Sequence, residues 1–217
     1  MRVTFIRHGA SEWNGGSRLC GQTDVALSTL GHSQAAALAE RLEGRRFDAL
    51  WSSPLQRASV TAGYVGAAIG HAVVTDPRLA EMDLGQFEGA RFVDLPVGPG
   101  TFRDRWQKNP ATVRFPQGEN LREVAQRAWT VLQELYDRHP HGHVVVVSHM
   151  FTLSALLCRV QRIRVARFRA FAIDVASIST VQMDKEGFRL LLLNDTSHLE
   201  LVPGSAMFCS KILPERG

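Results

Sequence analysis

The sequence predicts an α/β fold, a three-layer sandwich whose mostly parallel central sheet has helices on both faces. Segments with strand character alternate with amphipathic helical segments along the chain, which is the pattern of a doubly covered sheet. Residues 144–147 are four consecutive valines, as expected for a parallel strand that is buried on both sides. His8 and His149 each follow such a strand, and the carboxyl ends of parallel strands share the edge at which ligands bind.

The first strand is expected at residues 3–6, which are apolar and run into Arg7-His8-Gly9. A glycine-rich loop follows over residues 9–27. Ser28 is then a suitable N-cap for a helix that continues to Leu42, because the apolar residues recur there at helical spacing.

Two short strands flank the second helix. Residues 49–52 form the first of them. Ser53-Pro54 is expected to open the helix, since proline is accepted in the first helical turn, and the helix ends near Gly70. Residues 72–75 form the other strand.

Residues 76–118 are rich in glycine and proline and predict an irregular insertion with one short helix at 102–108. Insertions of this length in a compact domain are often lids or binding loops, so a lid that governs substrate specificity is expected. The rest of the chain is regular again, with a helix at 119–139, a strand at 144–147 that ends in Ser148-His149, a helix from Thr152, and a hairpin of strands 176–183 and 188–194 that turns at residues 184–187.

Composition places the chain among ordinary globular proteins. It has 217 residues, of which 45% are hydrophobic and 21% are charged, and no repeat or linker divides it, so residues 1–217 are expected to form one domain. The three cysteines, Cys20, Cys158 and Cys209, are widely spaced and suggest no disulfide framework. A cytoplasmic protein is the default expectation, because no segment has the length of a membrane span.

The formal net charge of +4 is spread along the chain, with its densest stretch in the arginines of residues 159–169. A solvated helix and loop is the favoured interpretation of that stretch, and an anion-binding patch is the alternative. Charge runs without interleaved aromatic residues are weak evidence for nucleic-acid binding. An anionic small substrate would suit the charge equally well.

Six blocks of residues follow one another in a fixed order. They are Arg7-His8-Gly9 with Glu12-Trp13-Asn14, Leu27-Ser-Thr-Leu-Gly31 with Gln34-Ala35, Ser52-Ser-Pro-Leu-Gln-Arg57-Ala58, Leu79-Ala-Glu81 with Gly85 and Phe87-Glu-Gly89, Gly118-Glu119 with Ser148-His149, and Asn194-Asp-Thr-Ser-His198-Leu199. Over most of the chain these blocks resemble the histidine phosphatase superfamily, in the branch that contains phosphoglycerate mutases and α-ribazole phosphatase-like enzymes.

The resemblance implies a role for each of five residues. His8 would be the nucleophile that forms a phosphohistidine. Arg7 and Arg57 would hold the phosphate through bidentate guanidinium contacts. His149 would be a second imidazole that stabilises charge on the phosphoryl group, and Glu81 would be the general acid that protonates the leaving group. Each of these residue types also occurs in purely structural roles, but the ordered pattern favours function.

Other residues have weaker assignments. Glu12 and Glu88 are carboxylates that compete with Glu81 for the role of general acid. The loop residues Asn14, Cys20, Gly21 and Gln22 are expected to contact phosphate or substrate, the cysteine and the glycine through their backbone amides. Glu119-Asn120 suits a cap of the following helix.

The chain departs from the family pattern at two places. Ala10 replaces the usual acidic residue, and Met150-Phe151 replaces a glycine after His149. The bulkier pair would narrow the pocket floor or shift a backbone amide, which would affect substrate specificity more than chemistry, and Met150 is expected to contact the substrate.

Two alternative sites find less support in the sequence. Cys158 and Arg164 have the spacing of cysteine phosphatases, but the intervening residues contain no glycine and continue a helical pattern. His139, His141 and His143 alternate as metal ligands can, although a turn with Pro140 and Gly142 explains them better. No metal and no cofactor are expected, because the arginines supply the positive charge that a metal would otherwise provide.

The expected activity is metal-independent hydrolysis of a phosphomonoester through a phosphohistidine, with a small phosphorylated metabolite as the partner. Mutases similar to this family carry a longer insertion after the glutamate block, which favours the phosphatase branch. Phosphoglycerate mutase-type transfer and a non-catalytic phosphate-ester-binding module are the alternatives. Neither nucleic acid nor a membrane is an expected partner, and a homodimer is left open.

Overall fold

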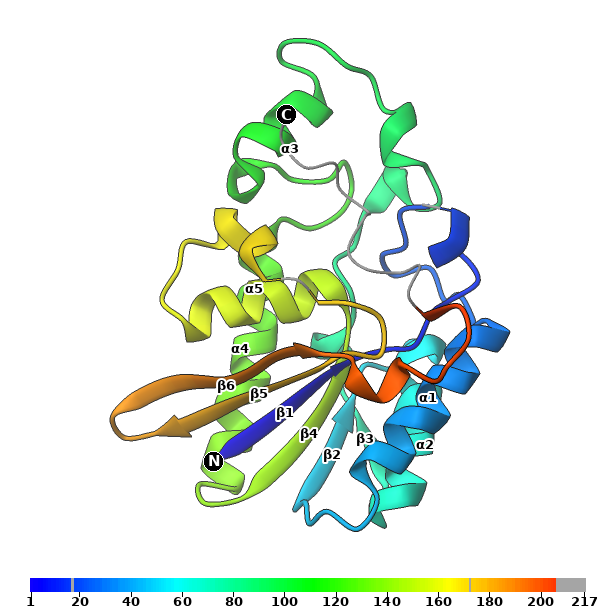
Figure 1. The fold of residues 1–217 in the computed structure, drawn as a ribbon. Helices are drawn as coiled ribbons and strands as arrows, with labels where there is room; N and C mark the ends of the chain where they lie inside the picture. The colour runs from blue at the N-terminus through cyan, green and yellow to red at the C-terminus, as the bar shows by residue number, and fades with distance from the viewer. Residues whose placement is uncertain (17, 172, 206–217) are drawn as a thin grey trace.

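The computed structural model describes residues 1–16, 18–171 and 173–205, and the described chain is built on a six-stranded sheet (Figure 1). The strands are β1 (Arg2–Arg7), β2 (Ala49–Ser52), β3 (Val73–Thr75), β4 (His143–Ser148), β5 (Ile178–Asp184) and β6 (Gly187–Asp195). Their order is β3-β2-β4-β1-β5-β6. The first four in this order are parallel, and β5 and β6 continue the sheet as an antiparallel hairpin. The expected mostly parallel sheet is confirmed.

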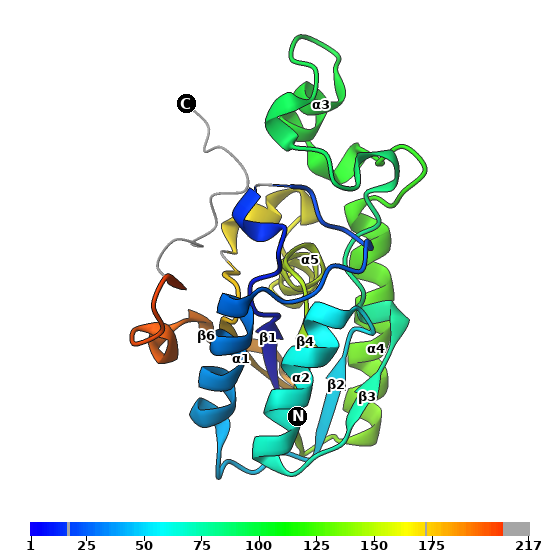
Figure 2. The same cartoon turned by 90° about the vertical axis from the view of Figure 1, so that its right-hand side faces the viewer.

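Helices cover both faces of the sheet. Helices α1 (Thr29–Leu42) and α2 (Gln56–Ile69) lie on one face, and α4 (Leu121–Arg138) and α5 (Met150–Val160) lie on the other (Figures 1 and 2). The all-valine strand β4 reflects this arrangement. Val144 and Val146 are buried in the core on the α4–α5 face, whereas Val145 and Val147 are buried on the α1–α2 face.

Three helix ends have the capping residues that the sequence predicts. The side chain of Ser28 accepts a hydrogen bond from the backbone N–H of Gly31, and α2 ends at Gly70, whose φ of 73° suits a glycine. Asn120 caps α4 in a reciprocal capping box with Glu123. Glu119 does not cap this helix, because its carboxylate pairs with Arg127 instead.

Three helices begin at other residues than expected, and one of them, α4, begins at Leu121 rather than at Glu119. Helix α2 starts at Gln56 rather than at Ser53-Pro54, and the carboxylate of Asp24 accepts a hydrogen bond from the Gln56 N–H at 2.7 Å. Helix α5 starts at Met150 rather than near Thr152, because the preceding His149 is extended and serves as the N-cap. The start of α2 therefore depends on a hydrogen bond to the distant residue Asp24, and the start of α5 depends on the extended backbone of His149. Local sequence patterns show neither feature.

The hairpin is shorter at its start than expected. Ala176 has a φ of 55°, which lies outside the extended region, so β5 begins at Ile178. The turn itself is tight, since Asp184 pairs with Gly187 across it.

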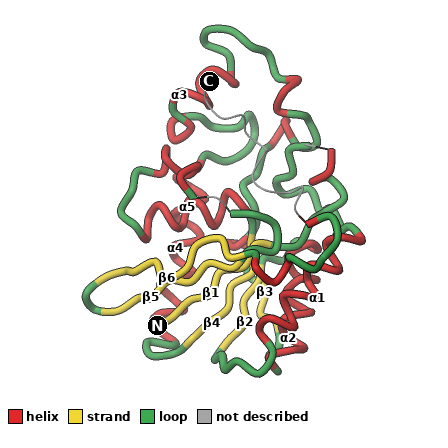
Figure 3. Tube along the Cα trace, in the orientation of Figure 1, coloured by secondary structure: helices red, strands yellow, loops and turns green. Residues whose placement is uncertain are grey.

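The insertion at residues 76–118 connects β3 to α4 and contains short 3₁₀ turns and the helix α3 (Phe102–Lys108), which agrees with the expected range (Figure 3). Figure 2 shows α3 set apart from the sheet. Trp106 in α3 packs against Phe151 and Phe168 with ring centroids 6.0 and 5.9 Å apart, which anchors the insertion to α5. Its function as a lid stays a prediction.

Cys20 and Cys158 are free thiols, and Cys209 lies outside the described residues. A search of the described residues for a helix with the length and apolar character of a membrane span finds none.

Candidate active site

The sheet topology brings the two strand-end histidines together. Strands β1 and β4 are adjacent, with Arg7 opposite Ser148, and the backbone N–H of His8 donates to the carbonyl oxygen of Ser148 at 3.0 Å. The ring centroids of His8 and His149 lie 5.0 Å apart, and both side chains are buried. Two imidazoles that are far apart in the sequence therefore share one site, as the strand pattern predicts.

Hydrogen bonding defines which nitrogen of His8 carries its proton. Nδ1 lies 2.6 Å from the carbonyl oxygen of Gly9, and a carbonyl can only accept. Nδ1 is therefore protonated, and Nε2 bears the lone pair. Burial, and then the charges of Arg57 and Arg7, hold the pKa of His8 well below its usual value, so the imidazole is neutral and nucleophilic at neutral pH.

Arg7 and Arg57 are positioned by backbone carbonyls. Arg7 Nη1 donates to Ile173 at 2.6 Å, and Arg57 donates from Nη1 to Thr23 at 2.9 Å and from Nη2 to Gly21 at 2.6 Å. Neutral carbonyls orient a guanidinium without cancelling its charge. Burial lowers the pKa of Arg7 to about 10, which leaves it cationic at neutral pH, and its buried Nε has no hydrogen-bond partner within the described part of the chain. Both cations are thus available to an anion.

Glu81 is a buried carboxyl group on the wall of the same pocket. Oε1 accepts from the backbone N–H groups of Met82 and Thr152, and Oε2 accepts from that of Phe151. These bonds favour the ionised form, yet burial outweighs them and raises the pKa of Glu81 above its usual value. The environment therefore suits a group that gives and takes a proton.

A narrow pocket of about 30 Å³ opens onto these groups. Its wall is made of Arg7, His8, Ser11, Asn14, Arg18, Leu19, Cys20, Arg57, Glu81, Met150 and Phe151. Asn14 lies on it with Oδ1 held by two hydrogen bonds from Ser11, which leaves its Nδ2 as the donating atom. Met150 is at the pocket as expected, and His149 is fully buried and not part of this wall.

Gly21 and Gln22 are not on the pocket wall, and their backbone N–H groups already have partners. Both donate to the carboxylate of Glu88, at 3.0 and 2.8 Å. That carboxylate also accepts from the backbone N–H groups of Thr23 and Leu84 and from the hydroxyl of Thr23. Glu88, considered above as a rival of Glu81, instead holds the loop that carries Cys20.

Several polar residues that support the site carry no readable signal in the sequence. The hydroxyl of Ser53 lies 2.7 Å from His149 Nε2, and the hydroxyl of Thr152 contacts Glu81 Oε1 at 3.2 Å. The guanidinium of Arg127 donates to the backbone carbonyls of Arg78, Ala80 and Glu81. Ser53 belongs to the block Ser52-Ser-Pro-Leu-Gln-Arg57-Ala58, but its partner His149 lies 96 residues away in the sequence, so the contact becomes visible in the fold alone.

The alternative sites do not assemble. Burial raises the pKa of both Cys20 and Cys158 to about 11, so neither is a thiolate at neutral pH, and Cys158 is fully buried in α5. His143 lies 2.8 Å from the Thr4 hydroxyl and against the ring of Phe47. Among the described residues, no three His, Cys, Asp or Glu side chains gather as metal ligands do.

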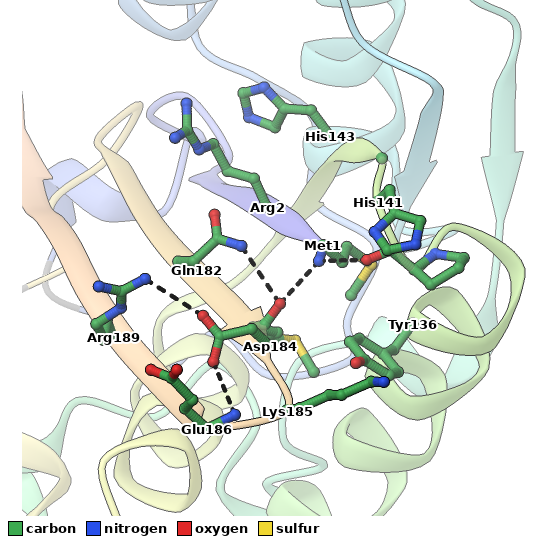
Figure 4. Close-up of a pocket in the computed structure, with 13 residues that line it drawn as sticks. Met1, Arg2, Tyr136, His141, His143, Gln182, Asp184, Lys185, Glu186 and Arg189 are labelled. Atoms are coloured by element: carbon green, nitrogen blue, oxygen red, sulfur yellow. Dashed lines mark hydrogen bonds and ion pairs between the residues drawn. The ribbon is translucent and has the colours of Figure 1, made fainter.

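A wider concavity of about 670 Å³ lies beside the start of β1 and the β5–β6 turn (Figure 4). Charges of both signs line it, and Asp184 already accepts from Arg189 and from the backbone N–H of Glu186. The amino group of Met1 donates to the carbonyl oxygens of Pro140 and Met183 at 2.7 Å each. None of the residues expected to act on phosphate lies there, so size alone does not locate the chemistry.

Comparison with known proteins identifies the family of the chain. The family model of the histidine phosphatase superfamily (branch 1) matches residues 3–196. The chain is 35% identical to "Phosphoserine phosphatase 1" of Hydrogenobacter thermophilus over 92% of its own length and 94% of that protein. It is 32% identical to "Probable phosphoglycerate mutase GpmB" of Proteus mirabilis over 92% of its own length and 95% of that protein.

Solved structures share the fold. A mycobacterial glucosyl-3-phosphoglycerate phosphatase matches with a TM-score of 0.79 and 33% identity, over 90% of this chain and 99% of that one. The Bacillus stearothermophilus protein YhfR matches with a TM-score of 0.85 and 27% identity, over 92% and 99% of the two chains. The match of the family model to nearly the whole chain decides the family. The protein is an enzyme of the histidine phosphatase superfamily, branch 1.

Proposed function

We propose that the protein is a metal-independent phosphomonoesterase that acts through a phosphohistidine at His8 on a small phosphorylated metabolite. The main support for the proposal is the hydrogen-bond arrangement of the two ring nitrogens of His8. Its Nδ1 is fixed as a donor to Gly9, so a neutral Nε2 lone pair is left beside two buried guanidinium groups. An anionic phosphoryl group is the electrophile that suits this combination.

The reaction follows in two balanced steps. In the first, His8 Nε2 forms a bond to phosphorus, the ester P–O bond breaks, and Glu81 gives its proton to the leaving alkoxide. In the second, water attacks phosphorus while the Glu81 carboxylate takes a proton from that water. The P–N bond breaks, and inorganic phosphate leaves a neutral His8 and a protonated Glu81.

The cations make both steps feasible. The guanidinium groups of Arg7 and Arg57 neutralise the non-bridging oxygens, which removes the repulsion between an anion and a nucleophile. Burial of Glu81 keeps a fraction of its carboxyl protonated above the usual pH range, which the first step needs. The charge at the site is supplied by side chains, so the proposed reaction has no metal-dependent step.

The names of the relatives suggest which esters to test first. Phosphoserine and glucosyl-3-phosphoglycerate, the substrates that two of those names print, are both phosphomonoesters of small hydroxy compounds that also carry a carboxylate. Phosphoryl transfer to a second phosphoglycerate is the competing outcome, because another relative is named a probable phosphoglycerate mutase.

The test is a steady-state assay with p-nitrophenyl phosphate, phosphoserine and 3-phosphoglycerate in the presence of EDTA. We expect release of inorganic phosphate that EDTA does not reduce and that His8→Ala abolishes. Interconversion of 3- and 2-phosphoglycerate without phosphate release would instead establish a mutase. Tight binding of these esters without turnover by the wild-type protein would refute the proposal and leave a binding module.

A further inference from the structure

His149 has two ring nitrogens in very different surroundings. Nε2 lies 2.7 Å from the hydroxyl oxygen of Ser53, which precedes α2. Nδ1 is buried and has no hydrogen-bond partner among the described residues, although the side chain is fully inaccessible to solvent. An unpartnered polar atom at this depth is costly, so a partner that binds during the reaction is expected to satisfy it.

The surroundings of Ser53 decide the direction of its bond to His149. The Ser53 oxygen already accepts the backbone N–H of Leu55 at 3.2 Å, and the hydroxyl has one proton to donate. His149 Nε2 is the acceptor that lies within reach of that proton. When Ser53 donates, its own hydrogen bonds are complete, His149 Nε2 bears the lone pair, and Nδ1 carries the ring proton.

The opposite arrangement leaves two groups unsatisfied. If Nε2 donated to Ser53, the buried hydroxyl proton would have no acceptor among the contacts that Ser53 makes. Nδ1 would then present a lone pair in a site whose cations, Arg7 and Arg57, are arranged for an anion. Two lone pairs that face each other repel, so this tautomer would oppose phosphate binding.

We infer that Ser53 is a positioning residue that holds His149 as its Nδ1–H tautomer, so that Nδ1–H donates to an oxygen of the phosphoryl group. The inference rests on the proposed function. The two imidazoles then have opposite hydrogen-bonding roles toward the phosphoryl group. His8 presents the lone pair of Nε2, because its Nδ1–H donates to the carbonyl oxygen of Gly9. His149 presents its Nδ1–H, because its Nε2 accepts from the hydroxyl of Ser53. The ring centroids lie 5.0 Å apart, so the two rings are close enough for one phosphoryl group to contact both.

Burial reinforces the assignment. Desolvation is the main cause that lowers the pKa of His149 well below its usual value, followed by the charge of Arg57. The ring is therefore neutral at neutral pH, and a neutral imidazole has one proton to place. Ser53 decides which nitrogen receives it.

The direct test is to determine the tautomer of His149 by NMR, from the nitrogen chemical shifts of the wild-type protein labelled with ¹⁵N-histidine. We expect His149 to show a protonated Nδ1 and an unprotonated Nε2, assigned by comparison with His149→Asn. Ser53→Ala should shift the two His149 signals toward a mixture of tautomers. A wild-type spectrum with the proton on Nε2 overturns the inference whether or not any variant folds.

Kinetics then connect the tautomer to phosphate handling. Ser53→Ala should lower kcat/KM for p-nitrophenyl phosphate about 10-fold or more, since one hydrogen bond to developing charge is lost. Ser53→Thr, which keeps the hydroxyl, should restore most of it. Ser52→Ala is the matched control, because Ser52 is equally buried but its hydroxyl donates to the backbone carbonyl of Ser53 rather than to an imidazole.

The outcomes separate this inference from the proposed function. Hydrolysis by the wild type that survives in Ser53→Ala at the level of the Ser52→Ala control would contradict the role of Ser53 and leave the phosphatase intact. Absence of hydrolysis in the wild type, with the expected His149 tautomer in the spectrum, would contradict the proposed function instead.

Discussion

At the scale of single residues, environment separates the roles of groups that look alike in the sequence. Glu81 and Glu88 are seven positions apart, and either carboxylate could have been chosen as the acid. The carboxylate of Glu88 accepts five hydrogen bonds from the loop at residues 21–23 and from Leu84, whereas Glu81 is buried on the pocket wall with a raised pKa. The first arrangement stabilises a loop, and the second prepares a proton transfer.

Glu81→Gln is therefore expected to reduce hydrolysis in a way that depends on the leaving group. Phosphoserine, whose alkoxide needs a proton, should lose roughly 10²- to 10⁴-fold in kcat/KM, and p-nitrophenyl phosphate should lose less in the first step. Steady-state rates with both esters check this. Equal losses for the two esters would contradict the assignment of Glu81 as the acid.

Activity should also depend on pH through the same two groups. The reaction needs a neutral His8 and a protonated Glu81, and burial lowers the first pKa and raises the second. Activity should fall at high pH as Glu81 ionises and at low pH only below the usual histidine range. A kcat/KM profile in phosphoserine shows both limbs, and persistence of the alkaline limb in Glu81→Gln would show that another group causes it.

At the scale of elements, the turns and caps between regular segments carry the site. The carboxylate of Glu88 accepts hydrogen bonds from the loop that follows β1. Helix α5 starts directly after His149, so that backbone N–H groups in its first turn donate to Glu81. The insertion at residues 76–118 contributes both glutamates and is anchored to α5 through Trp106 and Phe151. A change in one of these connections should therefore affect stability and substrate binding together.

Glu88→Gln is expected to loosen the loop at residues 20–23 without removing a reacting group. Loss of a charged acceptor from partly buried N–H donors should cost about 1.5–3 kcal/mol of unfolding free energy. KM should rise more than kcat falls, because Arg57 is oriented by carbonyls of this loop. Denaturant unfolding and steady-state kinetics measure both, with Glu12→Gln, an exposed carboxylate earlier in the segment that follows β1, as the control. Unchanged stability would contradict this role of Glu88.

At the scale of the whole molecule, the sheet and the histidine pair could be predicted because their signals are local. The valines of β4 indicate a buried parallel strand, and strand ends in such a sheet converge. The start of α2 could not be located, since Asp24 accepts its first N–H across 32 residues. The contacts of Glu88 with the loop and of Ser53 with His149 were missed for the same reason, because a partner distant in sequence leaves no periodic signal.

The buried neutral histidines make the stability of the whole fold depend on pH. Folding lowers the pKa of His8 and His149, so the unfolded chain binds more protons below about pH 6.5. The contribution of these two neutral rings to the free energy of unfolding is therefore fully present above that pH and is lost as the pH falls. Each of the two should cost about 1 kcal/mol of unfolding free energy between pH 6.5 and 5.5.

His143 should add to this dependence, since burial lowers its pKa to about 4, so its contribution is lost between pH 6.5 and that value. Denaturant titrations at a series of pH values check the slope, and His143→Gln should flatten it. The raised pKa of Glu81 changes stability in the opposite direction, so the comparison between variants decides. A slope that is equal in the wild type and in His143→Gln would contradict neutral burial of the His143 ring.

The phosphohistidine mechanism is tested most directly by identifying the residue that is phosphorylated during turnover. Glu81→Gln should slow attack by water on the phosphoenzyme, so this variant is mixed with p-nitrophenyl phosphate, quenched in alkali and digested for mass spectrometry. We predict an alkali-stable, acid-labile phosphoryl group on His8, and none when His8→Ala is added. A phosphoryl group on any other residue, or turnover by the His8→Ala enzyme, would contradict a phosphohistidine mechanism at His8.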